Sequence, residues 1–483
     1  MLRRLTLTPF RRLRPTAGVT PLVAALALAG CSSLAPTYQR PAAPVPAQFD
    51  AAASAPVAPA ASAPAAATPL VWTDLVRDER LRRLVQAALT ANRDLRVAAL
   101  NVQRAQAQLG LTEADRWPTI NGVFSASRAP NTVGKQTNTF QLGAQISGWE
   151  LDFFGRLKSL DDAARATLLA TEAGRRSSEL ALVASVLTAE RTLATDQALL
   201  ALAERTATSR ADTLRLTQLR FDRGAASQLE RASAQSLTAQ ADATATQLRR
   251  QVAQDRNALA LLLGGTPAAD LLPPAQPTAA DAATLPPLAD PFAPVPGALA
   301  SDVLLRRPDI VQAEQQLIAA NANIGAARAA FFPRISLTTS AGLVSSSLSN
   351  LLEAGSLAGS IASQALVTLF DHGRNQANLD VAKVNREIAV AQYEKALQSA
   401  FRDTADALAG QATWQEQLTA LQRQRDATRD IARLTRLRYD QGAASELERL
   451  DAERSLFSAE QALIQANLAE QLNRVGLWKA LGG

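Results

Sequence analysis

Side chains suited to catalysis or metal binding are few in this chain. Its 483 residues include one histidine, His372, and one cysteine, Cys31. Nucleophilic catalysis needs a nucleophile beside a base, and a transition-metal site needs several clustered ligands. No glycine-rich phosphate loop follows a strand, because the pair Gly264-Gly265 is typical of a helix end. We therefore predict no enzyme activity, no cofactor and no metal site, and we interpret His372 as a polar residue at a strand-to-helix junction.

Cys31 follows a segment that is typical of a secretion signal. A basic start with five arginines precedes an apolar stretch, Val19 to Ala29, that is too short to span a bilayer. The residues Leu28-Ala29-Gly30-Cys31 resemble the bacterial lipoprotein cleavage box, which implies acylation of Cys31. Ser32 at the next position resembles an outer-membrane sorting signal. An ordinary signal peptide with an incidental cysteine is the alternative.

The signal segment also explains the net charge. The whole chain has 50 basic and 44 acidic residues, but the five leader arginines leave 45 basic residues against 44 acidic ones. The high isoelectric point is therefore mostly a property of the leader, and we predict no nucleic-acid partner.

The remaining chain is built from a repeat. Residues 216–265 and 434–483 share one pattern without a gap: LTQLRFDRGAASQLER recurs as LTRLRYDQGAASELER at an offset of 218. A repeat of this length predicts a pseudo-symmetric body. The predicted organisation is a signal peptide at 1–30, a Pro/Ala-rich tether at 31–73, repeats at 74–265 and 301–483, and a Pro/Ala-rich linker at 266–300.

Each repeat contains the pattern of a long helical hairpin. No glycine or proline lies between Gly174 and Gly224, and apolar residues after Gly224 recur at the three/four spacing of a coiled-coil seam. In the first repeat we expect helices at 155–220 and 228–263, with a helix at 74–116 stacked end to end on the second. A membrane-surface amphipathic helix is the alternative, but the length and the narrow apolar stripe argue against it.

The tip of each hairpin has the residues of a tight turn. Gly224 and Gly442 suit the left-handed residue that ends a helix. Ser227 and Ser445 follow as N-caps, each with a glutamate three residues later, Glu230 and Glu448; this Ser-x-x-Glu pattern is a capping box.

Between the helices of each repeat the apolar period changes to two. Three runs show this pattern, at 120–127, 139–147 and 334–338, and residues 356–369 make a fourth, less regular run. Membrane β-strands have about 9–11 residues, and even the smallest barrels use about eight of them. Four strands leave open edges, which cannot face lipid, so several chains would have to share one barrel. A soluble two-stranded cap on each hairpin is the alternative.

Three segments and the doubled tips resemble one family. The segments are Pro36–Pro41 (PTYQRP), Val303–Ile310 (VLLRRPDI) and Asn323–Pro333 (NIGAARAAFFP). Together with the two Arg-Phe/Tyr-x-x-Gly tips, they resemble the TolC-like outer-membrane efflux proteins, in the lipidated branch that serves resistance–nodulation–division pumps. This resemblance implies a mainly α trimer with a long coiled-coil α-helical barrel and a shared 12-stranded membrane β-barrel, with the 266–300 linker outside the helical barrel. It also implies a periplasmic adaptor and an inner-membrane pump as partners.

The resemblance assigns roles to residues at the tips. Arg220, Gly224, Ser227, Arg438, Gly442 and Ser445 match the region that meets the adaptor. Glu230 and Tyr439 match a hydrogen-bonding pair that holds the periplasmic gate shut, and Glu448 and Asp451 match rings of carboxylates at the constriction. Ala444 stands where a charged residue is often found, which changes the details of the gate. A purely capping role explains Glu230 and Glu448 without a pore, whereas Asp451 has no such explanation.

The resemblance predicts a passive, lipid-anchored exit duct in the outer membrane that conducts small molecules for a tripartite efflux system. Two other functions stay open. One is the exit duct of a type I secretion system, which would use the same architecture. The other is a periplasmic coiled-coil scaffold without a pore, and the alternation in the predicted strands argues against it.

Overall fold

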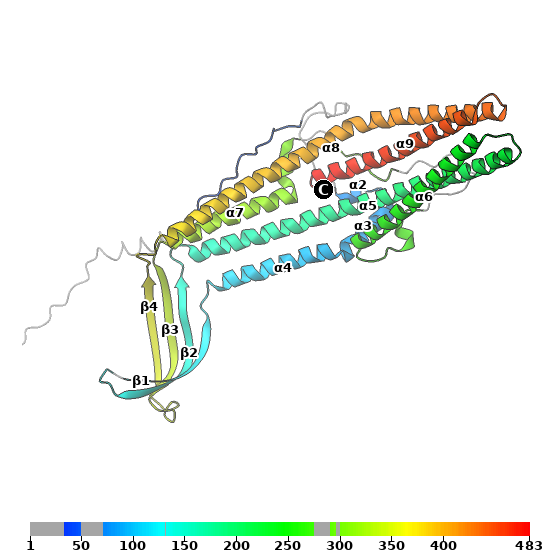
Figure 1. Cartoon of the computed structure of the whole chain (residues 1–483). Helices are drawn as coiled ribbons and strands as arrows, with labels where there is room; N and C mark the ends of the chain where they lie inside the picture. Colours follow the sequence, from blue (N-terminus) through cyan, green and yellow to red (C-terminus); the bar gives the residue numbers. More distant parts are fainter. Residues whose placement is uncertain (1–32, 50–70, 131, 275–289, 296–299) are drawn as a thin grey trace, which may run out of the picture. The chain divides into compact units, whose positions relative to one another are not determined.

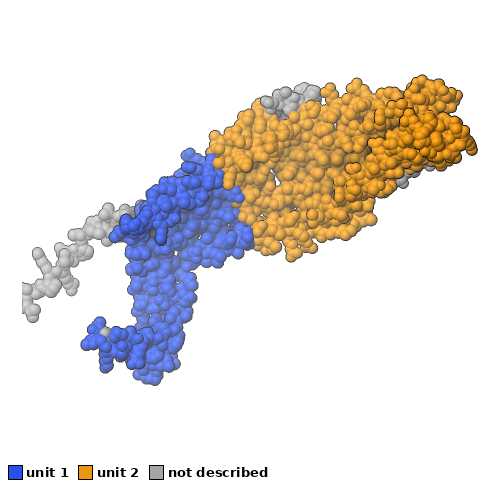
Figure 2. Space-filling view, viewed as in Figure 1, with its two compact units in different colours: residues 1–40, 104–168, 315–390 blue, residues 41–103, 169–314, 391–483 orange. Residues whose placement is uncertain are grey.

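The computed structural model describes residues 33–49, 71–130, 132–274, 290–295 and 300–483. The predicted signal peptide and Cys31 lie outside these residues. The chain divides into two compact units, coloured separately in Figure 2. Residues 1–40, 104–168 and 315–390 form the first unit, and residues 41–103, 169–314 and 391–483 form the second. Each unit therefore takes segments from both sequence repeats.

The first unit contains one antiparallel sheet of four strands in the order β1-β2-β3-β4 (Figure 1). The strands are β1 (Ile120–Pro130), β2 (Gln136–Leu151), β3 (Arg334–Ser345) and β4 (Leu357–Leu366). The central pairing joins the two repeats, with Leu142 of β2 opposite Leu343 of β3. A separate two-stranded cap on each hairpin is therefore wrong, because β2 and β3 make one continuous sheet.

The two faces of this sheet differ in character. The register aligns one apolar row across all four strands: Phe124, Leu142, Leu343 and Leu357. It aligns a polar row on the opposite face: Asn121, Gln145, Ser340 and Ser360. The hydroxyls of Ser340 and Ser360 are 2.8 Å apart. All of β4 and nearly all of β1 are exposed, so no layer of the described chain covers the outer strands.

Glycines permit the close pairing of β2 and β3. Gly143 and Gly342 lie opposite each other, and a Cβ on either residue would collide with the backbone of the other strand. The register shifts between Ile146 and Trp149, where Gly148 has a φ of 64° and its N–H donates to the Thr338 hydroxyl at 3.1 Å. A register shift of this kind is a β-bulge, which increases the local twist of the strand.

The start of the described chain packs on helix α7 (Pro308–Ala329). Asn321 donates to the Pro36 carbonyl at 2.7 Å, and Arg328 donates to the Leu34 carbonyl at 3.1 Å. A Cβ at Gly325 would collide with the backbone of Ala35. The described start of the predicted tether is thus bonded to α7, and the extended conformation of the tether as a whole stays a prediction.

Two helical hairpins of equal lengths make up most of the second unit, and the long first helix of each begins in the first unit (Figure 1). They are α5 (Arg156–Asp222) with α6 (Gln228–Leu262), and α8 (Arg374–Asp440) with α9 (Glu446–Ala480), of 67 and 35 residues in each copy. The predicted bounds of the first pair agree to within two residues. Among the described residues, each helix is either too short or too polar to cross a bilayer.

The segment predicted as one helix at 74–116 is broken. It forms α2 (Trp72–Leu75), α3 (Glu79–Ala91) and α4 (Arg93–Ala114). Asn92 causes the second break: its side-chain oxygen accepts from the Leu95 N–H at 2.9 Å, and its amide donates to the Leu262 carbonyl at 2.9 Å. The single-helix prediction was wrong because this asparagine caps α4 while it also satisfies the last turn of α6.

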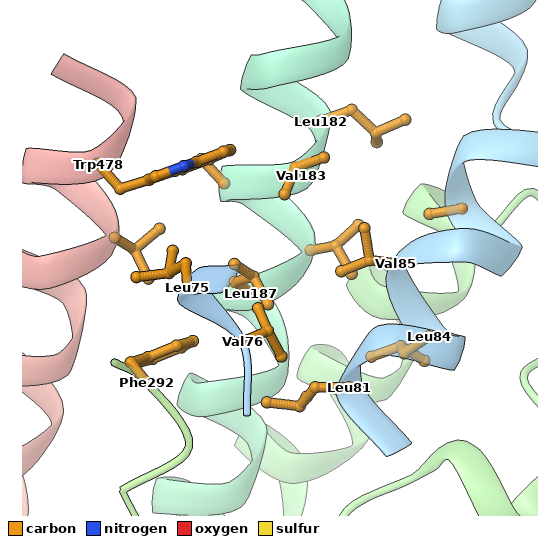
Figure 3. Close-up of a cluster of buried hydrophobic side chains, with 14 of the residues drawn as sticks. Leu75, Val76, Leu81, Leu84, Val85, Leu182, Val183, Leu187, Phe292 and Trp478 are labelled. Carbon is orange, nitrogen blue, oxygen red and sulfur yellow. The ribbon is translucent and has the colours of Figure 1, made fainter. Parts of the chain in front are cut away.

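The core of the second unit lies where α3, α5, α6 and α9 meet (Figure 3). The side chains of Trp478, Leu187 and Leu81 are at most 2% exposed. Phe292 is also fully buried, because residues 290–295 of the linker pair with the chain beside α2: the Ala293 N–H donates to the Leu75 carbonyl at 2.7 Å. The described end of the Pro/Ala-rich linker thus adds an aromatic side chain to the core. Two short 3₁₀ helices, η2 (Ala269–Leu271) and η3 (Ser301–Arg306), flank it.

Candidate gate at the helix tips

Both hairpin tips close with the same backbone motif. Gly224 and Gly442 have φ values of 72° and 70°, in the left-handed region that favours glycine. The Gly224 N–H donates to the Phe221 carbonyl at 2.9 Å, and the Ala225 N–H donates to the Arg220 carbonyl at 2.7 Å; the second tip repeats both bonds at the same lengths. This pair of bonds is a Schellman motif, as the glycine positions predict.

The two tip arginines hold these turns from outside. The Arg220 guanidinium donates to the Ala225 carbonyl at 3.4 Å, and the Arg438 guanidinium donates to the Ala443 carbonyl at 3.0 Å. Arginine offers several donors in a fixed fork, so each can secure a loop carbonyl and keep further donors for another partner.

The capping boxes differ between the tips. In the first, the Ser227 hydroxyl accepts from the Glu230 N–H at 3.1 Å, and Glu230 accepts from the Ser227 N–H at 2.5 Å. Hydrogen bonding to the backbone of Ser227, and then to its hydroxyl, lowers the pKa of Glu230. In the second, the Ser445 hydroxyl accepts from the Glu448 N–H at 3.2 Å. Among the described residues, the Glu448 carboxylate accepts no hydrogen bond from the Ser445 N–H in return. The Glu448 carboxylate is therefore exposed and available to another group.

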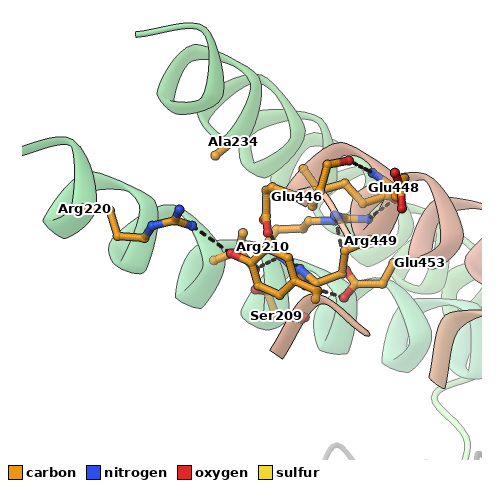
Figure 4. A network of polar contacts seen from close by, with 12 residues as sticks. Ser209, Arg210, Arg220, Ala234, Glu446, Glu448, Arg449 and Glu453 are labelled. Atoms are coloured by element: carbon orange, nitrogen blue, oxygen red, sulfur yellow. Dashed lines mark hydrogen bonds and ion pairs between the residues drawn. The ribbon is translucent and has the colours of Figure 1, made fainter. Parts of the chain in front are cut away.

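Tyr439 has a different partner in this chain from the one the resemblance implies. Its hydroxyl accepts a hydrogen bond from Arg220 at 2.8 Å, which ties the end of α8 to the end of α5 (Figure 4). Burial, and then hydrogen bonding to Glu446, raises the pKa of Tyr439. Within the described chain, Glu230 is bonded to Ser227, and no hydrogen bond joins it to Tyr439.

A cluster of charges lies behind Tyr439 on α9. Arg449 donates to Glu446 at 2.5 Å and 3.0 Å, and to Glu453 at 2.5 Å (Figure 4). The Arg449 and Glu446 side chains are only 11% and 9% exposed. Burial lowers the pKa of Arg449, but the hydrogen bond to Glu446 and the charge of Glu453 outweigh it and raise the pKa overall. We name Glu446, Arg449 and Glu453 the α9 cluster.

The α9 cluster reaches across to α5. Arg449 donates to the Thr213 hydroxyl at 3.0 Å, and Arg210 lies 3.3 Å from the Glu453 carboxylate. Burial lowers the pKa of Arg210, and the charge of Glu453 offsets part of this. Two helices from different repeats are thus joined by buried ionic contacts, which cost desolvation energy unless their geometry is good.

Asp451 and Glu448 lie on the other side of α9. At 100° per residue they are separated by 60° from each other and lie opposite Glu446, Arg449 and Glu453. Both are exposed, and Asp451 makes an ion pair with Arg454 at 3.0 Å on the surface. Helix α9 therefore has a buried charged face towards α5 and an exposed acidic face on its other side.

Sequence reasoning missed the α9 cluster, although a signal for it exists. Glu446, Arg449 and Glu453 stand at i, i+3 and i+7, which is the spacing of ion pairs along one helix face. The contacts with Arg210 and Thr213 have no such signal, because those residues lie more than 230 positions away.

The described residues hold no candidate metal site. Among them, no group of three or more His, Cys, Asp or Glu residues is placed to hold a metal ion. His372 stands between β4 and α8, as predicted, with a φ of 53° and its ring 4.5 Å from that of Phe370. Asp371 beside it accepts from the N–H groups of Gly373 and Asn375, which caps α8.

Known proteins are similar to this chain in sequence. The family model "Outer membrane efflux protein" matches residues 84–265 and 299–483. The solvent efflux pump outer membrane protein SrpC of Pseudomonas putida is 43% identical over 470 residues, which cover 96% of this chain and 97% of SrpC.

Solved structures agree with the fold. A membrane protein from Pseudomonas aeruginosa is 37% identical, with a TM-score of 0.83 over 93% of this chain and 100% of its own. The open state of the Neisseria gonorrhoeae MtrE outer membrane channel is 34% identical, with a TM-score of 0.80 over 94% of this chain and 98% of its own.

The long paired helices and the single sheet are therefore those of a TolC-like outer-membrane channel protein. The chain belongs to the outer membrane efflux protein family. Members of this family are channel proteins and not enzymes, in agreement with the absence of catalytic chemistry predicted from the sequence.

Proposed function

We propose that this protein is the outer-membrane exit duct of a tripartite efflux system, through which small molecules pass passively to the exterior. Family membership supports the outer-membrane location and the role in efflux. The energy would come from an inner-membrane pump of the resistance–nodulation–division class, and a periplasmic adaptor would join that pump to the tips of the duct.

The observation that carries this proposal is the sheet. Its apolar row runs across four strands on one face and its polar row on the other, which is the pattern of a strand wall between lipid and water. Within the described chain, strands β1 and β4 each pair on one side only, and unpaired edges cannot face lipid. Three chains would join these edges into a closed barrel of twelve strands.

The anchor and the partners complete the proposal. Acylation of Cys31 would hold each chain on the outer membrane, and the described residues after it, from Ser33, already pack on the fold. The adaptor would meet Arg220, Gly224, Ser227, Arg438, Gly442 and Ser445. The turns at these residues are rigid, because the Schellman motifs and the serine caps fix both sides of each tip.

The gate would lie at the same tips. Tyr439 and Glu230 are held by Arg220 and by the capping box, so in this chain each has a partner other than the one implied by resemblance. Glu448 and Asp451 are the exposed acids of α9, and three copies of each around an axis would favour cations over anions.

Ion conduction tests the proposal as a whole. The full-length protein, purified from native envelopes in detergent, should form channels in planar bilayers and should migrate as a trimer. Mass spectrometry of the same preparation should find acylated Cys31. A monomeric preparation that leaves the bilayers closed would contradict the proposal.

The gate has its own test. Asp451→Ala should reduce the preference for cations or raise the conductance, because it removes three negative charges near the axis. Ser233→Ala is the matched control, since Ser233 occupies the equivalent position in the first repeat. Equal conductance and selectivity for Asp451→Ala and the wild type would remove Asp451 from the gate.

A further inference from the structure

The two hairpins differ at one set of equivalent positions. The offset of 218 matches Glu446, Arg449 and Glu453 of α9 with Gln228, Arg231 and Gln235 of α6. Both arginines lie over the ring at the end of the preceding helix: Arg231 is 4.2 Å from the centre of the Phe221 ring, and Arg449 is 5.3 Å from that of Tyr439. The arginine is thus repeated, while its carboxylate partners occur in the second hairpin alone.

The partners of Arg449 make it part of a joint with α5. Arg210, which is 6% exposed, pairs with Glu453, and the Arg449 guanidinium also donates to Thr213. Positions 428 and 431, which match Arg210 and Thr213 in the second repeat, hold a threonine and an isoleucine. The charged residues that make this ionic joint are therefore not repeated at the equivalent positions. The joint holds α9, the helix that carries Glu448 and Asp451.

The geometry of α9 connects the joint to the acids. Arg449 follows Glu448 directly and precedes Asp451 by two residues. The side chains of the α9 cluster point towards α5, whereas Glu448 and Asp451 lie on the opposite face and are exposed. A rotation or displacement of α9 relative to α5 would consequently move both acids, and the buried ion pairs resist such a movement.

We propose that Arg449 is a positioning residue of the gate: through Glu446, Glu453, Arg210 and Thr213 it locks α9 to α5 and so sets where Glu448 and Asp451 stand. This inference rests on the proposed function, because it takes the exposed face of α9 to line the duct. All the contacts of this lock lie within one chain.

The test compares Arg449→Met with Arg231→Met in the full-length protein. Methionine keeps much of the aliphatic volume and removes the charge. In planar bilayers, Arg449→Met should raise the mean single-channel conductance by at least about twofold over the wild type, because a freed α9 widens the constriction. Arg231→Met removes the equivalent arginine, whose neighbours at the matching positions are glutamines, and should conduct as the wild type does. Arg449→Lys, which keeps the charge without the forked geometry, should restore part of the closed behaviour.

The thermal midpoint of the assembled protein separates positioning from simple stabilisation. A lower midpoint for Arg449→Met with wild-type conductance would overturn the proposal, since a merely structural residue behaves in this way. If Arg449→Met does not assemble, Glu453→Gln replaces it: this change introduces the amide of the first hairpin and keeps Glu446. Raised conductance of Glu453→Gln supports the lock, and wild-type conductance overturns it.

Asp451→Ala, measured beside these variants, distinguishes a failure of the proposed gate from a failure of the Arg449 lock. Altered selectivity in Asp451→Ala with wild-type behaviour of Arg449→Met would leave the gate in place and remove the lock. Unchanged behaviour of both variants would remove the gate itself, and the lock with it.

Discussion

A pair of carboxylates between α5 and α6 should make the protein less stable as the pH rises. Asp255 of α6 is 9% exposed; one of its oxygens accepts from Gln251 at 3.0 Å, and the other is buried without a hydrogen-bond donor. Asp196 of α5 stands beside it. Burial, and then hydrogen bonding to Asp255 and its charge, raises the pKa of Asp196 from 3.8 to about 7. A proton on Asp196 supplies the donor that Asp255 lacks.

The sign of the effect follows from this raised pKa. In the unfolded chain Asp196 loses its proton near its ordinary pKa of 3.8, whereas in the folded chain it keeps the proton up to about pH 7. The contribution of Asp196 to the free energy of unfolding is therefore largest below about pH 4, falls as the pH rises to about 7, and stays constant above that value.

The difference between a pKa of 3.8 and one of about 7 corresponds to an upper limit of about 4 kcal/mol in the free energy of unfolding. Because Asp196 is partly exposed and water screens the pair, we expect about 1–2 kcal/mol per chain. For a protein of this size that is a change of about 1–3 °C in the thermal midpoint.

The assay is thermal unfolding of Asp255→Asn and the wild type in detergent at pH 5 and pH 8. Asparagine keeps the shape, removes the charge and donates to Asp196, so the variant should gain stability relative to the wild type at pH 8. At pH 5 the gain should be smaller. Asp212→Asn, at an exposed position of α5, is the control and should show no such difference. An equal gain for Asp255→Asn at both pH values would refute the reasoning.

Two further substitutions test the tip and the core. Gly442→Val places a β-branched residue at a φ of 70°, which costs about 1–2 kcal/mol. It should weaken adaptor-dependent efflux without loss of the protein from the envelope, and normal efflux would count against the tip as the adaptor site. The control is Gly476→Val, in α9 with open space beside it. Trp478→Ala empties a fully buried position and should cost about 3–5 kcal/mol, seen as a lower thermal midpoint. A midpoint within a degree of the wild type would show that Trp478 does not anchor the core.

Local chemistry accounts for the parts of this fold that the sequence could predict. The positions of Gly224, Gly442 and Ser227 determine where the long helices end, because left-handed backbone and N-capping depend on neighbouring residues alone. The same holds for the strands, whose alternation is a local pattern. The turn residues of both tips can therefore be predicted from the amino-acid sequence alone.

Long-range contacts account for what the sequence did not predict. Asn92 breaks a segment of good helix formers because it bonds to Leu262, which is 170 residues away. The pairing of β2 with β3 joins strands from different repeats, so neither repeat alone indicates it. Arg449 shows the same limitation, since its spacing to Glu446 is visible in the sequence and its contact with Thr213 is not.

Cross-linking of the sheet edges tests most directly the claim that several chains close one barrel. Cysteine would replace Ser125 of β1, and cysteines would be scanned one at a time along β4, from Leu357 to Leu366, in otherwise unchanged protein. If β1 of one chain pairs with β4 of the next, oxidation of native envelopes should yield covalent trimers at positions two residues apart, with none between them. Cross-links confined to single chains, or only to pairs of chains, would contradict a barrel shared by three.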